Sequence, residues 1–486
     1  MRALIVACLL AALPFFGGAG RAFAQSEDPS DEVREMQEPA SEAVDLELTS
    51  PTATGAEVEW QDGGTAQEES AEPEEEAVEE SAEPQAEQAE PAEEEDRETF
   101  GDRFRRGDLF GWFDVQGRFF PQRAGNPLGA PQSNDYWVNG SMAWEPGFFM
   151  NVTDNMNFEL ILFGRVDQHD RNRTHGDIRE AFFELFFNQW TFGFGMHKVF
   201  WGVTESRHLV DIINQADLVE DFDPQIKLGQ AMITTSYTHD KAGIFSLYVM
   251  SWARPLVFPG PQGRPTLPVP VDNDIRIYES DWKEGQIDVA LRWSHSMAGF
   301  DWGLSYFFGT AREPQLFETM NSAGLPVLQP MYELINQGGL DAQYTVEGWL
   351  LKAEAIVREG QGPTFGAVTG GFEYTFYQAS GSIVDIGLIL EYNYDGRDNN
   401  TFIIFESDFF TGVRLSLSDV GSTEFLIGSF IDAKDGSVLI SAEASRRFGE
   451  SWKILLEGVG YIPQGDNLLQ VFRNDAYIKV DIEFHY

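Results

Sequence analysis

The sequence ends with the eleven residues AYIKVDIEFHY, numbered 476 to 486, in which apolar and polar side chains largely alternate. One parity holds Ala476, Ile478, Val480, Ile482, Phe484 and Tyr486, and the other holds Tyr477, Lys479, Asp481, Glu483 and His485. Successive side chains of a β-strand point to opposite faces of its sheet. The stretch therefore predicts a strand with hydrocarbon on one side and water on the other.

The same alternation recurs from about Thr99 onward. It is clear in residues 157–167, 349–357 and 386–394. A soluble β-sandwich also alternates, but segments of about ten residues with aromatic side chains near their ends are typical of tilted strands that cross a bilayer. The final aromatic residue, Tyr486, resembles the terminal signal by which the barrel-assembly machinery recognises outer-membrane proteins.

The parity pattern predicts an all-β fold, a transmembrane antiparallel β-barrel over residues 99–486. It has about eighteen strands, with sixteen as the alternative count. The expected strand starts are near 109, 136, 156, 177, 190, 229, 243, 286, 300, 340, 348, 368, 383, 403, 423, 437, 451 and 476. Short turns, such as those at 151–155, 188–190 and 448–452, alternate with long connections at 201–228, 255–285, 310–339 and 462–474. Both ends of the barrel segment, and the tail before it, are then expected on the periplasmic side.

Two segments precede the predicted barrel. Residues 1–24 have the order of a secretory signal peptide: a charge, an apolar run, and a small-residue site at Ala22-Phe23-Ala24. The one cysteine, Cys8, falls inside that segment, so we expect no disulfide in the mature protein. Residues 25–98 are rich in Glu, Ala and Pro, with 28 acids against two arginines between 26 and 98, which predicts a disordered acidic tail.

A barrel of eighteen strands is too wide for side chains to fill, so we expect an aqueous or partly plugged lumen. Charges of both signs on the inward parity orient and select solutes, or pair across strands to keep the wall rigid. The pore-lining candidates are Arg118, Glu159, Arg165, Asp167, Asp288, Arg292, Lys352, Glu354, Arg358, Glu391, Arg414, Lys479, Asp481 and Glu483.

The loop from 201 to 228 is the candidate constriction. Its charged and aromatic candidates are Trp201, Arg207, His208, Asp211, Asp217 and Glu220. They are interleaved with Leu209, Val210, Ile212 and Ile213, a spacing compatible with a short amphipathic helix. An apolar face in a loop needs a surface to pack on, and the sequence leaves open whether that surface is the barrel interior or an external cap.

Residues 165–202 carry a family resemblance. Arg165-Val166-Asp167, Asp177-Ile178-Arg179-Glu180-Ala181, and the stretch from Gly195 to Trp201-Gly202 resemble the alginate-export and related porin-like outer-membrane barrels. Those proteins tend to carry Arg-Gln after the glycine, where this chain has Met196 and His197. The resemblance implies an outer-membrane barrel of a Gram-negative bacterium with a transport role, rather than a particular substrate.

The sequence thus predicts a channel for small hydrophilic solutes, set in outer-membrane lipids. Two alternatives stay open: export of a polysaccharide or other polymer, and a structural or adhesive barrel with a plugged lumen. We expect no enzyme, because no nucleophile signature stands out, and no cofactor or metal, because no ligand spacing is diagnostic. The formal charge of −46 disfavours nucleic acid as a partner. The oligomeric state is not predicted.

Overall fold

The computed structural model describes residues 104, 106–124, 134–221, 225–397, 406–465 and 468–486. The predicted signal peptide at 1–24 and the acidic segment at 25–98 lie outside the described residues.

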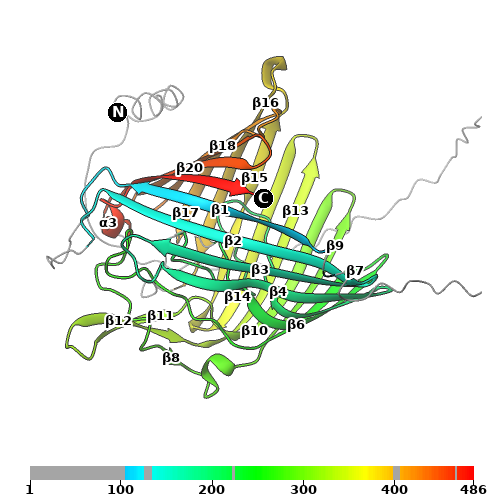
Figure 1. Ribbon diagram of the computed structural model, residues 1–486, viewed down its shortest axis with the longest axis horizontal. Helices are drawn as coiled ribbons and strands as arrows, with labels where there is room; N and C mark the ends of the chain where they lie inside the picture. The colour runs from blue at the N-terminus through cyan, green and yellow to red at the C-terminus, as the bar shows by residue number, and fades with distance from the viewer. Residues whose placement is uncertain (1–103, 105, 125–133, 222–224, 398–405, 466–467) are drawn as a thin grey trace, which may run out of the picture. The chain divides into compact units, whose positions relative to one another are not determined.

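Eighteen strands form one closed ring of antiparallel pairs (Figure 1). The first strand, β1, pairs with β2 on one edge and with the last strand, β21, on the other, so the sheet has no free edge. The strands are β1 (Asp108–Phe119), β2 (Val138–Thr153), β3 (Met156–Asp167), β4 (His175–Phe187), β5 (Trp190–His197), β6 (Gln230–His239), β7 (Gly243–Met250), β9 (Asp288–Met297), β10 (Phe300–Thr310), β13 (Leu334–Val346), β14 (Trp349–Gly360), β15 (Gly362–Phe376), β16 (Val384–Asp395), β17 (Ser407–Leu417), β18 (Glu424–Asp432), β19 (Val438–Phe448), β20 (Trp452–Ile462) and β21 (Tyr477–His485). The predicted barrel of eighteen strands is confirmed.

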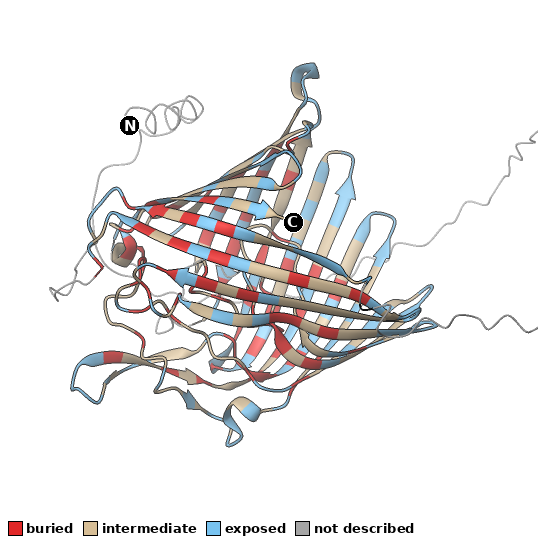
Figure 2. Cartoon of the chain, viewed as in Figure 1, coloured by how far each residue is buried: buried red, intermediate tan, exposed pale blue. Residues whose placement is uncertain are grey.

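The two faces of the ring differ in burial along each strand, which gives the banding of Figure 2. On β16, Leu388 and Leu390 are 42% and 39% exposed, whereas Glu391 between Leu390 and Tyr392 is 1% exposed. Exposed aromatic residues gather near the short-turn ends of the strands, among them Phe187, Trp190, Phe300, Tyr344, Trp349, Phe376 and Trp452. An apolar outer face with aromatic ends and a polar inner face is the surface of an outer-membrane β-barrel.

The connections longer than seven residues all lie at one end of the ring. The turns after β2, β4, β6, β9, β13, β15, β17 and β19 are short, and they lie at the end where β1 begins and β21 finishes. The opposite end carries the long connections and a second sheet of three short strands, β8 (Ile277–Tyr278), β11 (Gln315–Met320) and β12 (Pro326–Tyr332). We call these the short-turn end and the long-loop end.

Two expectations about these connections are wrong. Residues 310–339 are not one loop: they contain β11 and β12, and β13 already begins at Leu334 rather than near 340. Similarly β15 begins at Gly362 rather than near 368, because β14 turns into β15 through the single residue Gln361. Glycine supplies this tight reversal, since Gly360 and Gly362 have φ of 112° and 80°. Within the described residues no helix is both long and apolar enough to span a membrane.

Buried apolar side chains lie inside the ring rather than between layers. The largest cluster joins inward residues of β4 to β15 to residues of the connection between β5 and β6. It comprises Phe182, Trp201, Leu209, Val210, Ile212, Ile213, Met232, Met250, Ala290, Phe307, Ala311, Ile335, Ile356, Phe365 and Ala367. The connection between β5 and β6 therefore folds inward and packs against the wall of the lumen.

Candidate functional site

The candidate site is the segment 198–221, which crosses the lumen. It holds no regular helix, so the predicted amphipathic helix over its apolar residues is wrong. Its apolar side chains are buried all the same: Val210 and Ile213 are 0% exposed and Trp201 is 3% exposed. An irregular backbone can bury these side chains because wall residues, instead of a helix, satisfy its N–H and C=O groups.

Glu354 of β14 satisfies part of that backbone. Its Oε1 accepts hydrogen bonds from the backbone N–H of Val203 at 2.7 Å and of Thr204 at 3.1 Å, and from the Thr204 hydroxyl at 2.8 Å. Its Oε2 accepts one from the N–H of Val210 at 3.2 Å. A buried carboxylate that receives several donors is stabilised, so Glu354 fixes the bend of the segment between residues 203 and 210.

Glu391 and Asp395 of β16 hold the next part of the segment. Glu391 accepts from the backbone N–H of Glu205 and of Ser206, each at 2.8 Å, and from the Ser206 hydroxyl at 2.6 Å. Asp395 pairs with the Arg207 guanidinium at 2.8 Å. These acids on β16 and Glu354 on β14 stand on the two strands that flank β15, and we call this side of the ring the acidic wall.

The other end of the segment is acidic and meets basic side chains. Asp217 lies 2.6 Å from Arg179 of β4, Glu220 lies 2.7 Å from Arg165 of β3, and Asp221 lies 2.7 Å from Lys479 of β21. We call the residues Arg118, Arg165, Arg173, Arg179 and Lys479 the basic wall. The segment thus runs between two walls of opposite charge. The acidic wall holds residues 203–210, and the basic wall holds the acidic residues at 217–221.

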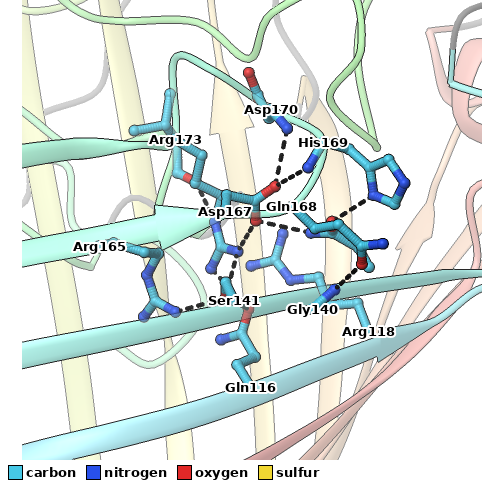
Figure 3. Close-up of polar contacts among 12 residues, drawn as sticks. Gln116, Arg118, Gly140, Ser141, Arg165, Asp167, Gln168, His169, Asp170 and Arg173 are labelled. Atoms are coloured by element: carbon cyan, nitrogen blue, oxygen red, sulfur yellow. Dashed lines mark hydrogen bonds and ion pairs between the residues drawn. The ribbon is translucent and has the colours of Figure 1, made fainter.

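Arg173 joins the basic wall from the turn between β3 and β4 (Figure 3). Its guanidinium donates to Asp167 at 2.7 Å, to Gln116 at 2.7 Å and to the Val219 carbonyl at 2.9 Å. Arg165 reaches Ser141 at 2.8 Å in the same network. Buried charges are tolerated when they are paired and hydrogen-bonded, and this network satisfies most of its members.

Asp217 shows the electrostatic effect of these partners. Burial alone would raise the pKa of its carboxyl, but the hydrogen bonds and charges of His175 and Arg179 outweigh burial and hold the pKa below its ordinary value of 3.8. Asp217 is therefore ionised at neutral pH, and the attachment of this end of the segment depends on that charge.

The predicted site residues fall into two groups. Those that contact or pack around the lumen-crossing segment are Arg118, Arg165, Lys352, Glu354, Glu391, Arg414 and Lys479. Those paired or hydrogen-bonded within the wall or to neighbouring connections are Asp167, Asp288, Arg292, Arg358, Asp481 and Glu483. Glu159 lies half-buried on β3 opposite Phe182.

The six candidates of the segment itself are spread along its length. Trp201 lies in the apolar cluster, and Arg207, Asp217 and Glu220 form the ion pairs described above. Asp211 pairs with Lys227 at 3.0 Å, and the His208 ring nitrogen Nδ1 lies 3.8 Å from Glu354.

Sequence reasoning missed Arg173, Arg179 and Asp395 as residues of the site. Strict alternation cannot place both Arg179 and Glu180 inside, yet they are 2% and 6% exposed. The pairing of β3 with β4 shifts register between Ile161 and Leu162, which inserts one extra residue on β4. Such a bulge lets two adjacent side chains face inward. The charges at the successive positions Arg179 and Glu180 were the signal in the sequence that could have indicated it.

One sector of the lumen is not covered by the segment. Inward residues of β6 to β15 such as Met232, Ala290 and Ile335 are at most 4% exposed. On β19 and β20, by contrast, inward Glu443 is exposed and Lys453 is half-buried. Toward the long-loop end of these strands, inward Leu439 and Tyr461 are buried against Leu469 and Phe472. We call the inward face of β18 to β20 toward the short-turn end the open sector. Water therefore reaches the wall there, off the centre of the ring.

The arrangement places charged groups of both signs around the lumen-crossing segment, where they can orient charged or polar groups. No cluster of three or more His, Cys, Asp or Glu able to hold a metal ion occurs among the described residues.

Comparison with known proteins gives likeness of structure only. No known family description matches the sequence, and no curated protein matches it. The carbohydrate-binding barrel Wzi of Escherichia coli is similar in structure at 10% identity and a TM-score of 0.44, over 76% of this chain and 84% of that one. OprB of Pseudomonas putida matches at 10% identity and a TM-score of 0.38, over 78% and 94%. OmpF of Salmonella typhi matches at 11% identity and 0.38, over 78% and 97%.

Proposed function

We propose that the protein is an outer-membrane channel for small hydrophilic solutes, with its short-turn end in the periplasm and its long-loop end outside. The observation that carries the proposal is a closed ring whose lumen is crossed by an anchored segment and yet keeps one solvent-exposed sector. A charged wall beside a narrowed passage favours small polar solutes and excludes polymers. No catalytic activity forms part of this proposal.

Solutes would pass along the open sector, between the lumen-crossing segment and strands β18 to β20. Arg414 of β17 marks the border of that sector, where its guanidinium lies 2.8 Å from Glu205 of the segment. Because acids outnumber bases in the barrel segment, we expect a mild preference for cations.

Single-channel recording in planar bilayers tests the proposal. Purified protein should give discrete conductance steps, with reversal potentials in a salt gradient that show a mild cation preference. The variant Ile213→Ala truncates a fully buried side chain by which the segment packs on the wall, at a cost of about 2–5 kcal/mol in packing. It should loosen the segment and raise or destabilise the conductance.

Leu325→Ala is the matched control, because Leu325 is 59% exposed in the connection between β11 and β12 and should leave conductance unchanged. Folded wild-type protein that gives no steps at any voltage would remove the channel proposal. A clear anion preference would remove only the inferred cation preference.

A plugged barrel that presents its long-loop end to partners is the second candidate. The β11–β12 hairpin favours it, because Phe317, Met320 and Leu325 expose apolar surface there. A non-conducting wild type that becomes conducting as Ile213→Ala would support this alternative. Polymer export is less well supported, since a polymer would have to displace a segment held by both walls.

The last strand fits assembly in the outer membrane. Tyr486 hydrogen-bonds through its backbone N–H to Gly111 at 3.1 Å, and its hydroxyl accepts from Trp144 at 3.0 Å. We infer that the terminal aromatic residue is the feature read by the barrel-assembly machinery and that it then helps to close the ring.

A further inference from the structure

Two rows of charge run across β19, β20, β21 and β1, where the ring closes. The first row lies nearer the short-turn end, and its members are opposite one another in register: Arg447 with Lys453, Lys453 with Glu483, and Glu483 with Asp114. We call these four residues the mouth row. From β19 to β1, its residues are two bases followed by two acids.

The second row lies four residues deeper on each strand and has the reverse order. Glu443 is opposite Glu457, Glu457 is opposite Lys479, and Lys479 is opposite Arg118. This deep row is satisfied by the protein itself: Lys479 pairs with Glu457 and Asp221, and Arg118 donates to the Glu220 carbonyl at 2.8 Å.

The mouth row is not satisfied in the same way. Within the described part of the chain, no ion pair is found for Arg447 or Lys453, although the two face each other directly on neighbouring strands. Like charges placed opposite each other destabilise a sheet. An anion bound between them would remove that cost.

The two acids of the mouth row, Asp114 and Glu483, are also incompletely paired with cations. Asp114 is 3% exposed, and its Oδ1 has no hydrogen-bond partner among the described residues, while its Oδ2 lies 3.3 Å from Arg165. Among the residues that the structure describes, the ion pair found for Glu483 is with His485, at 2.9 Å, and the Glu483 side chain is 18% exposed. A solute cation would meet Glu483 first, with the Asp114 carboxyl group behind it.

We propose that the mouth row binds a zwitterionic solute with the chemistry of a short peptide. Its carboxylate lies against Arg447 and Lys453, and its ammonium group lies against Glu483. Neighbouring strands are about 4.8 Å apart, so Arg447 on β19 and Glu483 on β21, two strands away, stand about 10 Å apart. An extended peptide spans about 3.3–3.6 Å per residue, which makes a tripeptide the matching length. This inference deepens the proposed function, because it names a substrate class for the same lumen.

Isothermal titration calorimetry on the detergent-solubilised full chain tests the site with three probes. Triglycine carries both charges, N-acetyl-triglycine carries only the carboxylate, and triglycinamide carries only the ammonium group. Triglycine should bind on the order of tenfold more tightly than either analogue, because each analogue loses one charged contact. Binding should also weaken as salt is raised.

The double variant Arg447→Gln with Lys453→Gln should remove the preference for triglycine, and Glu483→Gln should reduce it independently. Arg446→Gln is the matched control: it removes the same charge one residue away, on the outward parity, where Arg446 pairs with Asp419 at 2.9 Å. A shift in gel mobility between boiled and unboiled samples shows that each variant is folded.

Equal affinity for the three probes would overturn the inference, and so would tighter binding of N-acetyl-triglycine, which would indicate a simple anion site. Calorimetry does not depend on conductance. A barrel that conducts without preferring triglycine would contradict the zwitterion site alone, and a barrel that binds triglycine without conducting would contradict the channel alone.

Discussion

At the scale of single residues, the lumen is stable because its buried charges are matched in sign. Arg179 is 2% exposed and would be very costly alone, but it lies 2.6 Å from Asp217 and its guanidinium stacks 4.3 Å from the Phe163 ring. Removing one member of such a pair leaves the other charge buried and unpaired, which is more damaging than the pair is stabilising.

This matching predicts a pH dependence for the acidic end of the segment. The pKa of Asp217 is held below 3.8 in the folded protein, so its contribution to stability is present above the unfolded pKa and is lost as pH falls through the folded value. The protection factors for hydrogen exchange of the backbone amides at 217–221 should therefore stay high at neutral pH and fall as the pH drops below 3.8, through the folded pKa.

The Asp217→Asn variant separates this effect from general acid unfolding. Its amides at 217–221 should already exchange faster at pH 7, and the fall in protection below pH 3.8 should shrink. The same pH profile in wild type and Asp217→Asn would mean that another group controls the attachment.

At the scale of elements, the lumen-crossing segment behaves as a folded part without regular secondary structure. Glu354 and Glu391 of the acidic wall accept backbone hydrogen bonds that a helix would otherwise satisfy, and the apolar cluster supplies the packing. The segment should therefore exchange its amides as slowly as a strand does, although its backbone is irregular.

Glu354→Gln tests this dependence on the acidic wall. The amide keeps one acceptor oxygen but presents an NH₂ group where an acceptor stood, so some donors among Val203, Thr204 and Val210 lose their partner. We expect a loss of about 1–3 kcal/mol in local stability, seen as faster hydrogen exchange at 203–210.

Glu359→Gln on the same strand is the control, because Glu359 is exposed and on the outward parity. It should leave exchange at 203–210 unchanged. Protection that survives in Glu354→Gln would show that the apolar cluster alone fixes the segment.

The sequence predicted the elements better than the site. Alternation located fifteen of the eighteen strand starts within about three residues, since one face of each strand has to meet lipid. It missed the start of β17 by four residues, and it missed β13 and β15 by six, because they begin in Gly- and Gln-containing stretches where parity is weak. It could not find Arg173 or Asp395, because their roles depend on which strands face the lumen-crossing segment. Parity says which side of a strand a residue lies on, and it does not say which loop that side meets.

At the scale of the whole barrel, the chain separates two solvents, and a substitution should be judged by the face on which it falls. Leu390 lies near the middle of β16 on the outward face and is 39% exposed. Ser441 lies on the inward parity of β19, beside the open sector, and is half-buried. Arginine at these two sites should therefore destabilise the barrel by very different amounts.

Leu390→Arg places a charge in the hydrocarbon and should destabilise the barrel by about 2–4 kcal/mol, whereas Ser441→Arg keeps its charge in water and should cost much less. Folding into lipid vesicles across a urea series measures both, with the fraction folded read from gel mobility before boiling. Equal destabilisation by the two variants, or a folded Leu390→Arg protein that stays soluble without detergent, would contradict the assignment of lipid outside and water within. The order of the two midpoints therefore tests which face of β16 and of β19 meets lipid.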